Sequence, residues 1–312
     1  MEEELILVTG ASGFIGRALV TALAKQGYAV RAAARDPARI VAVSDVERVE
    51  IPDLVGSLDW SPLLAGVTHV VHLVGIAHAP GTLPDDVYTQ INAEAVGTLA
   101  QQAKGRVERV VLMSSVRAQA GLSADAPITE ADAPQPTDTY GRTKLEAERL
   151  LAESGVGYTV LRPAVVYGKG VKGNIASLAT IAKTPMPLPF GGLDNKRSLL
   201  AIENLISAVT HVLEAPDAAG ETYLVADAAP ISVAELVGAM REGLGRPPHL
   251  VKVPVGAVRK VLKSFGREAD WERVSGEFVI DVSKLMATGW RPQVETRAGI
   301  VRMMRAENGA AA

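Results

Sequence analysis

The fold class that this sequence predicts is α/β, with a doubly wound parallel sheet and a second, smaller, mainly helical lobe. Three observations lead to it. Short apolar runs recur through the first half of the chain, separated by stretches with helical periodicity. A glycine-rich turn, TGASGFIG at 9–16, follows the first of these runs. The regular alternation stops near residue 168, where glycine, lysine and proline become frequent.

The first strand–helix unit carries the clearest signal. Residues 5–8 are wholly apolar, as in a strand buried on both faces of a parallel sheet. Gly10, Gly13 and Gly16 follow at a spacing of three, and a helical pattern then runs to Gly27, which suits a C-terminal cap. Glycines permit a tight turn and close approach of the backbone, while a helix N-terminus offers N–H groups to a pyrophosphate. The turn therefore predicts a dinucleotide site, although GxxGxxG is less common than GxGxxG.

The remaining elements follow in chain order. Further strands are expected at 28–34, 46–51, 69–74, 109–113 and 158–162, with helices at 86–103 and 140–154. In the helix at 140–154 the charged residues are expected largely outward, namely Lys144, Glu146, Glu148 and Arg149. The segment 118–139 contains three prolines and is expected to be a long functional loop.

The second half is less regular. Its pattern predicts helices at 174–183, 202–213, 233–244 and 296–305, and a short strand at 222–226. We therefore assign 1–168 to a dinucleotide-binding Rossmann domain, to which 195–226 returns, and 169–312 mainly to a substrate-binding lobe.

Composition excludes several classes of protein and site. The formal net charge is −3 with both signs interspersed, so no nucleic-acid partner is expected. Cysteine is absent and the histidines lack metal-ligand spacing, so no metal is expected, and His69 and His72 are interpreted as structural. No apolar run reaches the ~18 residues of a membrane span. The acidic start MEEE is the reverse of a signal peptide, so we expect a cytoplasmic protein with no membrane association.

Tyr140 and Lys144 lie four residues apart, on one face at the start of a predicted helix. A tyrosine has an ordinary pKa of about 10, so acid–base work near pH 7 needs roughly 4 kcal/mol of preferential phenolate stabilisation. One cation at ~4 Å supplies that magnitude at an effective dielectric near 20, which gives the lysine spacing a physical reason. Ser114 and Ser115 end a predicted strand, at the edge where open α/β sheets bind ligands, and a serine there can hydrogen-bond a substrate oxygen.

At this point the sequence resembles the extended short-chain dehydrogenases/reductases, the family of NAD(P)-dependent nucleotide-sugar epimerases, dehydratases and 4-keto reductases. The resemblance covers nearly the whole chain, through TGASGFIG at 9–16, Asp53-Leu54, VVHLVG at 70–75, Asn92 in INAEAVGT, SSVRA at 114–118, YGRTK at 140–144, RPAVVYG at 162–168, Asn174, NKRSLL at 195–200 and TGWRP at 288–292. It implies that Tyr140 is the acid–base residue, that Lys144 supports it and holds the nicotinamide ribose, and that Ser115 polarises the reacting oxygen.

The resemblance also implies the binding residues. Those for the cofactor are Gly10, Ser12, Gly13, Phe14, Ile15, Gly16, Arg35, Asp53, Leu54, Val74, Asn92, Tyr140, Lys144 and Pro163. Those for the substrate are Ser115, Asn174 and Arg197, since an arginine can grip a pyrophosphate through two hydrogen bonds. A homodimer through the helices at 86–103 and 140–154 is a further implication of the family.

Two departures from the family pattern narrow the reaction. Arg35 ends the second predicted strand, where NAD-preferring members usually carry an acid; arginine suits a 2′-phosphate, so NADP is expected, while Asp36 leaves NAD open. Val116 and Arg117 follow Ser115, where dehydratases carry the acid that protonates the leaving hydroxyl, so dehydration is disfavoured.

The expected reaction is hydride transfer at C4 of a UDP- or dTDP-linked sugar, as a 4-keto reductase or a 4-epimerase. Arg35 slightly favours the reductase, because a dissociating NADPH suits net reduction. The alternative is a non-catalytic NAD(P)-binding structural subunit of a larger complex, against which the intact Ser115, Tyr140 and Lys144 argue.

Overall fold

A computed structural model of the chain describes residues 4–56, 58–77, 83–254, 256 and 276–309. Its larger part is built on a seven-stranded sheet in the order β10-β6-β5-β4-β1-β2-β3, with every neighbouring pair parallel. The strands are β1 (Leu5–Thr9), β2 (Ala29–Ala34), β3 (Val46–Glu50), β4 (His69–His72), β5 (Arg109–Met113), β6 (Tyr158–Pro163) and β10 (Glu221–Val225). The predicted fold class is confirmed, and the strands differ from the predicted ones only at their ends.

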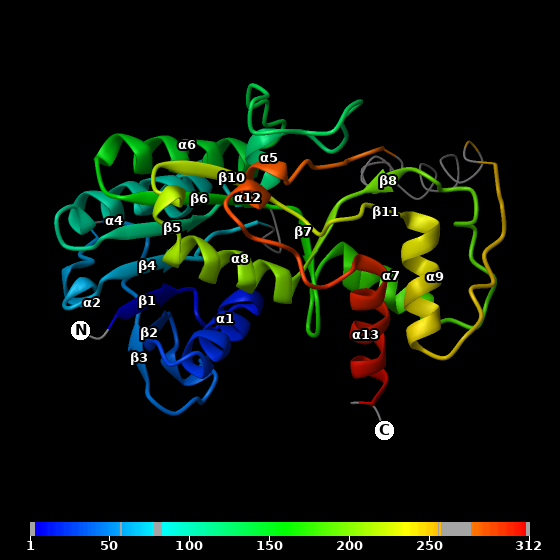
Figure 1. Cartoon of the computed structure of the whole chain (residues 1–312), viewed down its shortest axis with the longest axis horizontal. Coiled ribbons are helices and arrows are strands. Elements are labelled where there is room, and N and C mark those ends of the chain that lie inside the picture. The colour runs from blue at the N-terminus through cyan, green and yellow to red at the C-terminus, as the bar shows by residue number, and fades with distance from the viewer. Residues whose placement is uncertain (1–3, 57, 78–82, 255, 257–275, 310–312) are drawn as a thin grey trace.

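Helices cover both faces of this sheet (Figure 1). One face packs against α1 (Phe14–Lys25) and α8 (Ile202–Glu214). The other packs against α2 (Ser61–Leu64), α4 (Ala95–Ala103) and α6 (Thr139–Ser154). Both faces of the strands are therefore apolar, which is why the strands appear in the sequence as continuous apolar runs rather than alternating ones.

The helix expected at 86–103 is continuous but changes its winding on the way. It begins as α3 (Asp85–Thr89), passes through the π-helical turn η2 (Gln90–Glu94) and continues as α4. Such turns interrupt the regular backbone ladder and are frequent at functional sites. Here the turn contains Asn92, whose side chain is completely buried.

The smaller lobe packs three helices around a core of its own (Figure 1). These helices are α7 (Asn174–Ala182), α9 (Val233–Gly243) and α13 (Thr296–Gly309). The start of α9 is fixed by a capping box, in which Ser232 accepts from the Glu235 N–H and the Glu235 carboxylate accepts from the Ser232 N–H.

Shorter elements connect the two parts. Two small sheets pair β7 (Val165–Tyr167) with β9 (Leu199–Ala201), in parallel, and β8 (Lys196–Arg197) with β11 (Ile231–Ser232), antiparallel. The remaining elements are η1 (Pro37–Arg39), α5 (Val116–Gln119), η3 (Pro216–Ala218) and α12 (Ser283–Ala287). The chain leaves the main sheet after β6 and returns to it as β10. The division at residue 168 remains a prediction, as does the extent of the returning segment.

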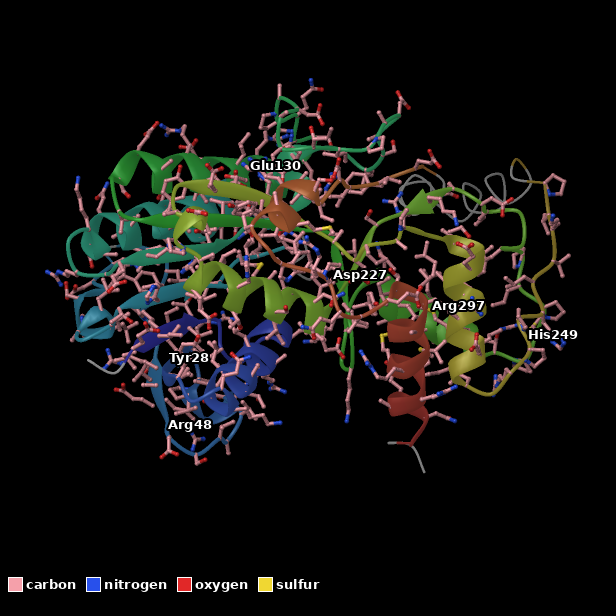
Figure 2. The ribbon with its side chains drawn as sticks, in the orientation of Figure 1. Tyr28, Arg48, Glu130, Asp227, His249 and Arg297 are labelled. Atoms are coloured by element: carbon pink, nitrogen blue, oxygen red, sulfur yellow. The ribbon has the colours of Figure 1, made fainter. Side chains whose placement is uncertain are left out.

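A buried polar cluster lies where the two parts meet. Figure 2 places Asp227 between the main sheet and the end of α13. Its carboxylate accepts hydrogen bonds from the Tyr167 hydroxyl at 2.9 Å, the Asn204 Nδ2 at 2.7 Å and the Ala201 N–H at 2.8 Å. The Tyr167 hydroxyl also lies 3.2 Å from the Thr296 carbonyl oxygen. We call Tyr167, Asn204, Asp227 and Thr296 the joint cluster.

One helix departs from the expected pattern of exposure. Lys144 and Glu148 of α6 were expected largely outward, but they are 3% and 6% exposed. This expectation is wrong because both side chains have partners inside the protein. Arg162 donates through Nε to both Glu148 carboxylate oxygens, at 3.0 and 3.1 Å, and Lys144 donates to the Met113 carbonyl. Glu146 and Arg149 do lie on the outer face of α6 and pair with each other.

No helix among the described residues is long and apolar enough to cross a membrane.

Candidate active site at the carboxyl edge of the sheet

The glycine turn brings β1, the segment after β4 and the start of α1 into close backbone contact. Gly10 has φ +72°, and a Cβ there would lie 3.3 Å from the Val74 backbone nitrogen. A Cβ at Gly16 would lie only 2.3 Å from the Gly10 carbonyl oxygen, so only glycine lets α1 start this close to the turn. Gly13 is the N-cap and has no side-chain capping bond among the described residues. The first N–H groups of α1, those of Phe14 and Ile15 included, therefore suit an anionic group such as a pyrophosphate.

Three of the predicted cofactor-binding residues, Arg35, Asp53 and Leu54, follow neighbouring strands at the same sheet edge. Arg35 follows β2 and is exposed, while the Asp36 carboxylate accepts from the Ala38 N–H at 3.0 Å and caps η1. Asp53 is exposed after β3 and accepts from the Val55 N–H at 3.2 Å, and Leu54 is buried beneath it. Because β1, β2 and β3 are parallel neighbours, these positions share the edge that carries the glycine turn. The arrangement fits a dinucleotide laid across the carboxyl ends of these strands.

Asn92 holds the segment that follows β4. Its Oδ1 accepts from the Ile76 N–H at 2.7 Å, and its Nδ2 donates to the Ile76 carbonyl at 3.0 Å and to the Thr143 Oγ1 at 3.1 Å. A Cβ on Gly75 would lie 3.2 Å from both the Asn92 Oδ1 and the Lys144 Nζ. The predicted cofactor residue Asn92 thus ties the segment after β4 to α6, close to Lys144.

Lys144 is buried and held by one backbone acceptor. Its Nζ donates to the Met113 carbonyl at 2.8 Å, at the end of β5. Burial lowers the pKa of Lys144 to about 8, and the charge of Glu148, one turn further along α6, counteracts part of this shift. The ammonium is therefore fixed in position at the end of β5, directly before the two serines.

Ser115 and Tyr140 meet at the same place. Ser115 caps α5 and accepts from the Arg117 N–H at 3.1 Å, and it is hydrogen-bonded to the Tyr140 hydroxyl. Burial raises the pKa of Tyr140; the hydrogen bond to Ser115 and the charge of Arg117 lower it, and the charge of Asp138 raises it. We expected Lys144 to lower the pKa of Tyr140. It is not among the groups that shift this pKa, because its ammonium is hydrogen-bonded to the Met113 carbonyl.

A cavity of about 350 Å³ opens in front of this pair. The predicted site residues on its wall are Ser115, Tyr140, Pro163, Asn174 and Arg197. The Arg197 guanidinium donates to the carbonyls of Leu122 and Gly276, and burial lowers its pKa to about 10. Asn174, the first residue of α7, is exposed and also lines the cavity. The cavity therefore lies between the main sheet and the smaller lobe, and its wall includes the predicted catalytic residues Ser115 and Tyr140 and the cation of Arg197.

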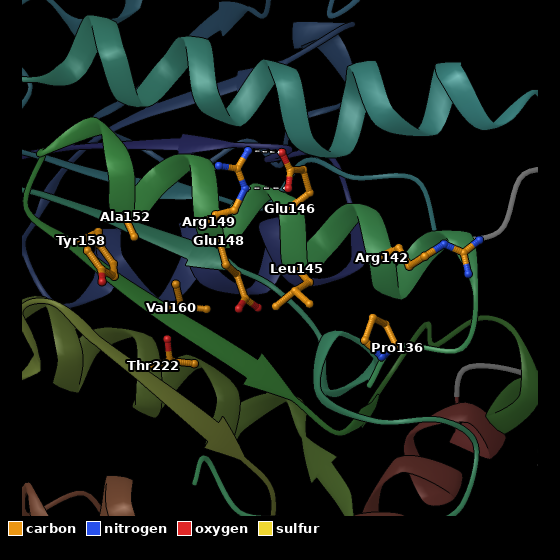
Figure 3. A pocket seen from close by; sticks show the side chains of 10 residues that line it. All are labelled: Pro136, Arg142, Leu145, Glu146, Glu148, Arg149, Ala152, Tyr158, Val160 and Thr222. Carbon is orange, nitrogen blue, oxygen red and sulfur yellow. Dashed lines mark hydrogen bonds and ion pairs between the residues drawn. The ribbon is translucent and has the colours of Figure 1, made fainter. Parts of the chain in front are cut away.

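A second hollow, of about 440 Å³, lies between α6 and the strands β6 and β10 (Figure 3). Its wall includes Leu145, Ala152, Tyr158 and Val160, with the paired Glu146 and Arg149 at its rim. None of Ser115, Tyr140 or Lys144 lines it. The predicted catalytic residues Ser115 and Tyr140 line only the first of these two hollows, which is therefore the candidate active site.

The sequence did not predict two parts of the site. One is the ion pair between Arg117 and Asp138, at 2.8 Å. The other is the buried pair of Glu148 and Arg162, which also takes in Ser114, whose hydroxyl donates to the Glu148 carboxylate. A glutamate four residues beyond Lys144 was the only available hint of the second pair. Neither partner of either pair is near the other in sequence. No group of three or more histidine, aspartate or glutamate side chains in the described part of the chain could hold a metal ion.

Comparison with known proteins agrees with this geometry. Residues 6–226 match the family described as "NAD dependent epimerase/dehydratase family". A UDP-glucose 4-epimerase from Vibrio cholerae is 33% identical over 313 residues, which cover 96% of this chain and 94% of that protein. The structure of MoeE5 in complex with UDP-glucose and NAD matches with a TM-score of 0.77 at 26% identity, over 98% of this chain and 99% of that chain.

A UDP-glucuronic acid 4-epimerase from Bacillus cereus, solved in complex with NAD, shares the fold with a TM-score of 0.76 at 22% identity, over 96% of this chain and 95% of that chain. The predicted family resemblance is confirmed. The chain belongs to the NAD-dependent epimerase/dehydratase family of extended short-chain dehydrogenases/reductases.

Proposed function

We propose that the protein catalyses hydride transfer at C4 of a UDP-linked sugar, and that 4-epimerisation is its reaction. The observation that carries the proposal is the meeting of Ser115 and Tyr140 at one wall of a cavity, with the Lys144 ammonium fixed behind them. The Vibrio cholerae relative, which spans nearly the whole chain, supports the epimerase and the UDP-sugar class.

Each residue has a role that its contacts support. A dinucleotide held at the N-terminus of α1 would supply the nicotinamide as hydride acceptor and donor. Tyr140 takes the proton of the C4 hydroxyl and later returns it, and Ser115 holds the same oxygen through its hydroxyl. Lys144 keeps a positive charge at the end of β5, where it can hold a ribose hydroxyl. Asn174 and Arg197, across the cavity, suit the uridine diphosphate, since a guanidinium binds phosphate oxygens strongly.

The cofactor of the family is NAD, and the choice between NAD and NADP in this chain depends on Arg35. An exposed guanidinium at the end of β2 suits a 2′-phosphate, which favours NADP and a second candidate function, reduction of a UDP-4-keto sugar by NADPH. Epimerisation instead suits a retained NAD, as bound in the MoeE5 structure.

One experiment separates these functions. The purified protein is incubated with UDP-glucose and, separately, with a UDP-4-keto-6-deoxy sugar, with and without NADPH, and the products are identified by NMR. Isomerisation without added cofactor supports the epimerase, and NADPH-dependent reduction supports the reductase. Tyr140→Phe should abolish either reaction. Absence of both reactions contradicts the proposal and leaves the structural-subunit alternative.

A matched titration addresses the cofactor. NADH and NADPH are titrated into the wild-type protein and into Arg35→Ala, with nicotinamide fluorescence as the readout. Tighter binding of NADPH that Arg35→Ala weakens supports NADP. Tighter binding of NADH that Arg35→Ala leaves unchanged contradicts the NADP prediction. A homodimer through α4 and α6 remains a prediction, which sedimentation of the purified protein tests.

A further inference from the structure

We propose that the ion pair of Arg117 and Asp138 is a positioning device of the active site, which fixes the distance between Ser115 and Tyr140 and balances the charge around the phenol. The proposal rests on the hydride-transfer function proposed above. Neither residue belongs to the catalytic trio, and Arg117 stands where dehydratases of the family place an acid.

The pair connects the two segments that carry the catalytic hydroxyls. Arg117 lies two residues after Ser115, and Asp138 lies two residues before Tyr140. The Arg117 Nη2 donates to the Asp138 Oδ2 at 2.8 Å and to the Thr137 Oγ1 at 3.1 Å. The Asp138 Oδ1 accepts from the Gly141 N–H at 2.7 Å and so caps α6. One carboxylate therefore holds the start of the tyrosine helix and the guanidinium next to the serine.

The backbones of α5 and the first turn of α6 are closely packed. A Cβ on Gly141 would lie 2.3 Å from the Arg117 carbonyl oxygen, so the first turn of α6 rests directly on α5. The Arg117 N–H also donates to the Ser115 Oγ at 3.1 Å. Because that bond occupies an acceptor site of the serine, the serine proton is left to point toward the phenol and the reacting oxygen. Losing the guanidinium removes the side-chain link between α5 and the start of α6.

The charges around Tyr140 come from three directions. Arg117 faces it from α5; Asp138 and Lys144 belong to α6, and Arg197 lies across the cavity on β8. The charge of Asp138 raises the pKa of Tyr140 and that of Arg117 lowers it. Burial acts to raise the pKa of Asp138, but Arg117 and the Gly141 N–H outweigh it and hold that pKa below its usual value, so Asp138 stays ionised.

Removing Arg117 alone therefore leaves an ionised carboxylate beside the phenol without its counter-charge. The phenol should then lose its proton less readily, and Ser115 and Tyr140 should be held less firmly. Removing both charges, in Arg117→Gln/Asp138→Asn, should restore the pKa of Tyr140, while Ser115 and Tyr140 remain less firmly held. The double variant therefore separates the effect of the pair on charge from its effect on positioning.

The test is a titration of Tyr140 in the intact protein by NMR of tyrosine labelled with ¹³C at Cζ, with Tyr140→Phe to assign its signal. Arg117→Gln should raise the pKa of Tyr140 by ~0.5–1 unit, from one charge at several ångströms in a medium of effective dielectric near 20. The double variant should titrate like the wild type. Arg149→Gln, which removes one positive charge from the outer face of α6, is the matched control and should leave the titration unchanged.

Activity gives the second readout. In Arg117→Gln the kcat should fall about 10-fold near pH 7, with its pH profile displaced upward and KM little changed, because the effect is on proton transfer. Arg117→Lys keeps the charge without the planar fork; it should titrate like the wild type but lose kcat.

An Arg117→Gln protein with an unaltered Tyr140 titration overturns the proposal. If Arg117→Gln does not fold, the same titration is carried out on Asp138→Asn and Arg117→Lys. Asp138→Asn should lower the pKa of Tyr140, and Arg117→Lys should leave it unchanged. The NMR titration needs no substrate. A displaced titration in a protein that turns over neither sugar therefore contradicts the proposed function and leaves this inference standing.

Discussion

At Gly16 there is no room for one methyl group. A Cβ there would lie 2.3 Å from the Gly10 carbonyl oxygen and 2.7 Å from the Ala11 Cα, and these are backbone atoms that cannot rotate away. We expect Gly16→Ala to destabilise the protein by ~1–3 kcal/mol, as overpacked sites do, and to abolish dinucleotide binding. Urea unfolding and NADH fluorescence measure the two effects.

The control for Gly16→Ala is the same substitution in another helix. At Gly238 in α9 the nearest atom to a Cβ would be 4.0 Å away, so alanine should fit and stabilise the helix by up to ~1 kcal/mol. Equal effects at the two sites would show that the turn tolerates a side chain, and the geometric argument for the cofactor site would fail.

His72 makes the stability of the protein depend on pH. It is completely buried at the end of β4, with its Nδ1 3.0 Å from the Thr9 Oγ1, and burial lowers its pKa to about 3. In the unfolded chain the pKa is about 6.5, so below that pH only the unfolded chain takes up the proton. The contribution of His72 is therefore complete above pH 6.5 and is lost as the pH falls toward 3. At pH 5 the loss should be about 2 kcal/mol.

Urea unfolding at pH 7 and pH 5 checks this dependence. His72→Asn should flatten it, because the neutral amide cannot take up the proton. His249→Asn, at an exposed position with φ +43° that asparagine tolerates, should leave the dependence as in the wild type. An unaltered pH dependence in His72→Asn would assign the acid sensitivity to other groups.

At the scale of elements, α6 carries two of the proposed catalytic residues on one side. Tyr140, Lys144 and Glu148 follow at intervals of four, so all three lie on the buried face of one helix. The first two were predicted from this spacing together with the serines at the end of β5. Glu148 was assigned to the wrong face, because its partner Arg162 comes from β6 and a pair formed across two elements has no local pattern in sequence. Arg117 and Asp138 were missed for the same reason.

The buried pair in α6 should be sensitive to the loss of one partner. Glu148→Gln leaves the Arg162 guanidinium, 7% exposed, without its counter-charge, and we expect a loss of about 3–5 kcal/mol in the free energy of unfolding. Glu146→Gln on the outer face of the same helix removes an exposed partner of Arg149 and should cost less than about 1 kcal/mol. Chemical denaturation of both variants provides the comparison. Similar losses in the two would mean that the Glu148 pair is not desolvated as the structure has it.

At the scale of the whole molecule, the joint cluster holds the main sheet and the smaller lobe together. Tyr167→Phe removes the hydroxyl that donates to Asp227 and leaves a buried carboxylate oxygen without that donor. We expect a loss of about 1–3 kcal/mol, measured by urea unfolding. Tyr158→Phe, at the rim of the hollow along α6, is the control and should stay within about 0.5 kcal/mol of the wild type. Equal losses in the two variants would show that the Tyr167–Asp227 hydrogen bond makes no specific contribution to stability.

The molecule as a whole was only partly predictable. Alternating apolar runs and helical patterns predicted the parallel sheet, because each strand is buried on both faces and leaves a local signature. The pairings β7–β9 and β8–β11 were not predicted, since these strands have only two or three residues each and are fixed by contacts with distant segments. The cavity lies between the two parts, so its walls come from segments far apart in the chain.

The return of the chain to the sheet as β10 also has a consequence for synthesis on the ribosome. The edge of β6 opposite β5 pairs with β10, and the chain between them contains α7 and α8. A nascent chain that has emerged only as far as α8 therefore exposes an open strand edge along Tyr158–Pro163, and open edges are templates for pairing with other chains. Of the three helices of the smaller lobe, only α7 precedes β10 in the chain, so that edge is covered before α9 and α13 are made. Tyr158–Pro163 can pair with β10 only after Glu221–Val225 has emerged from the ribosome.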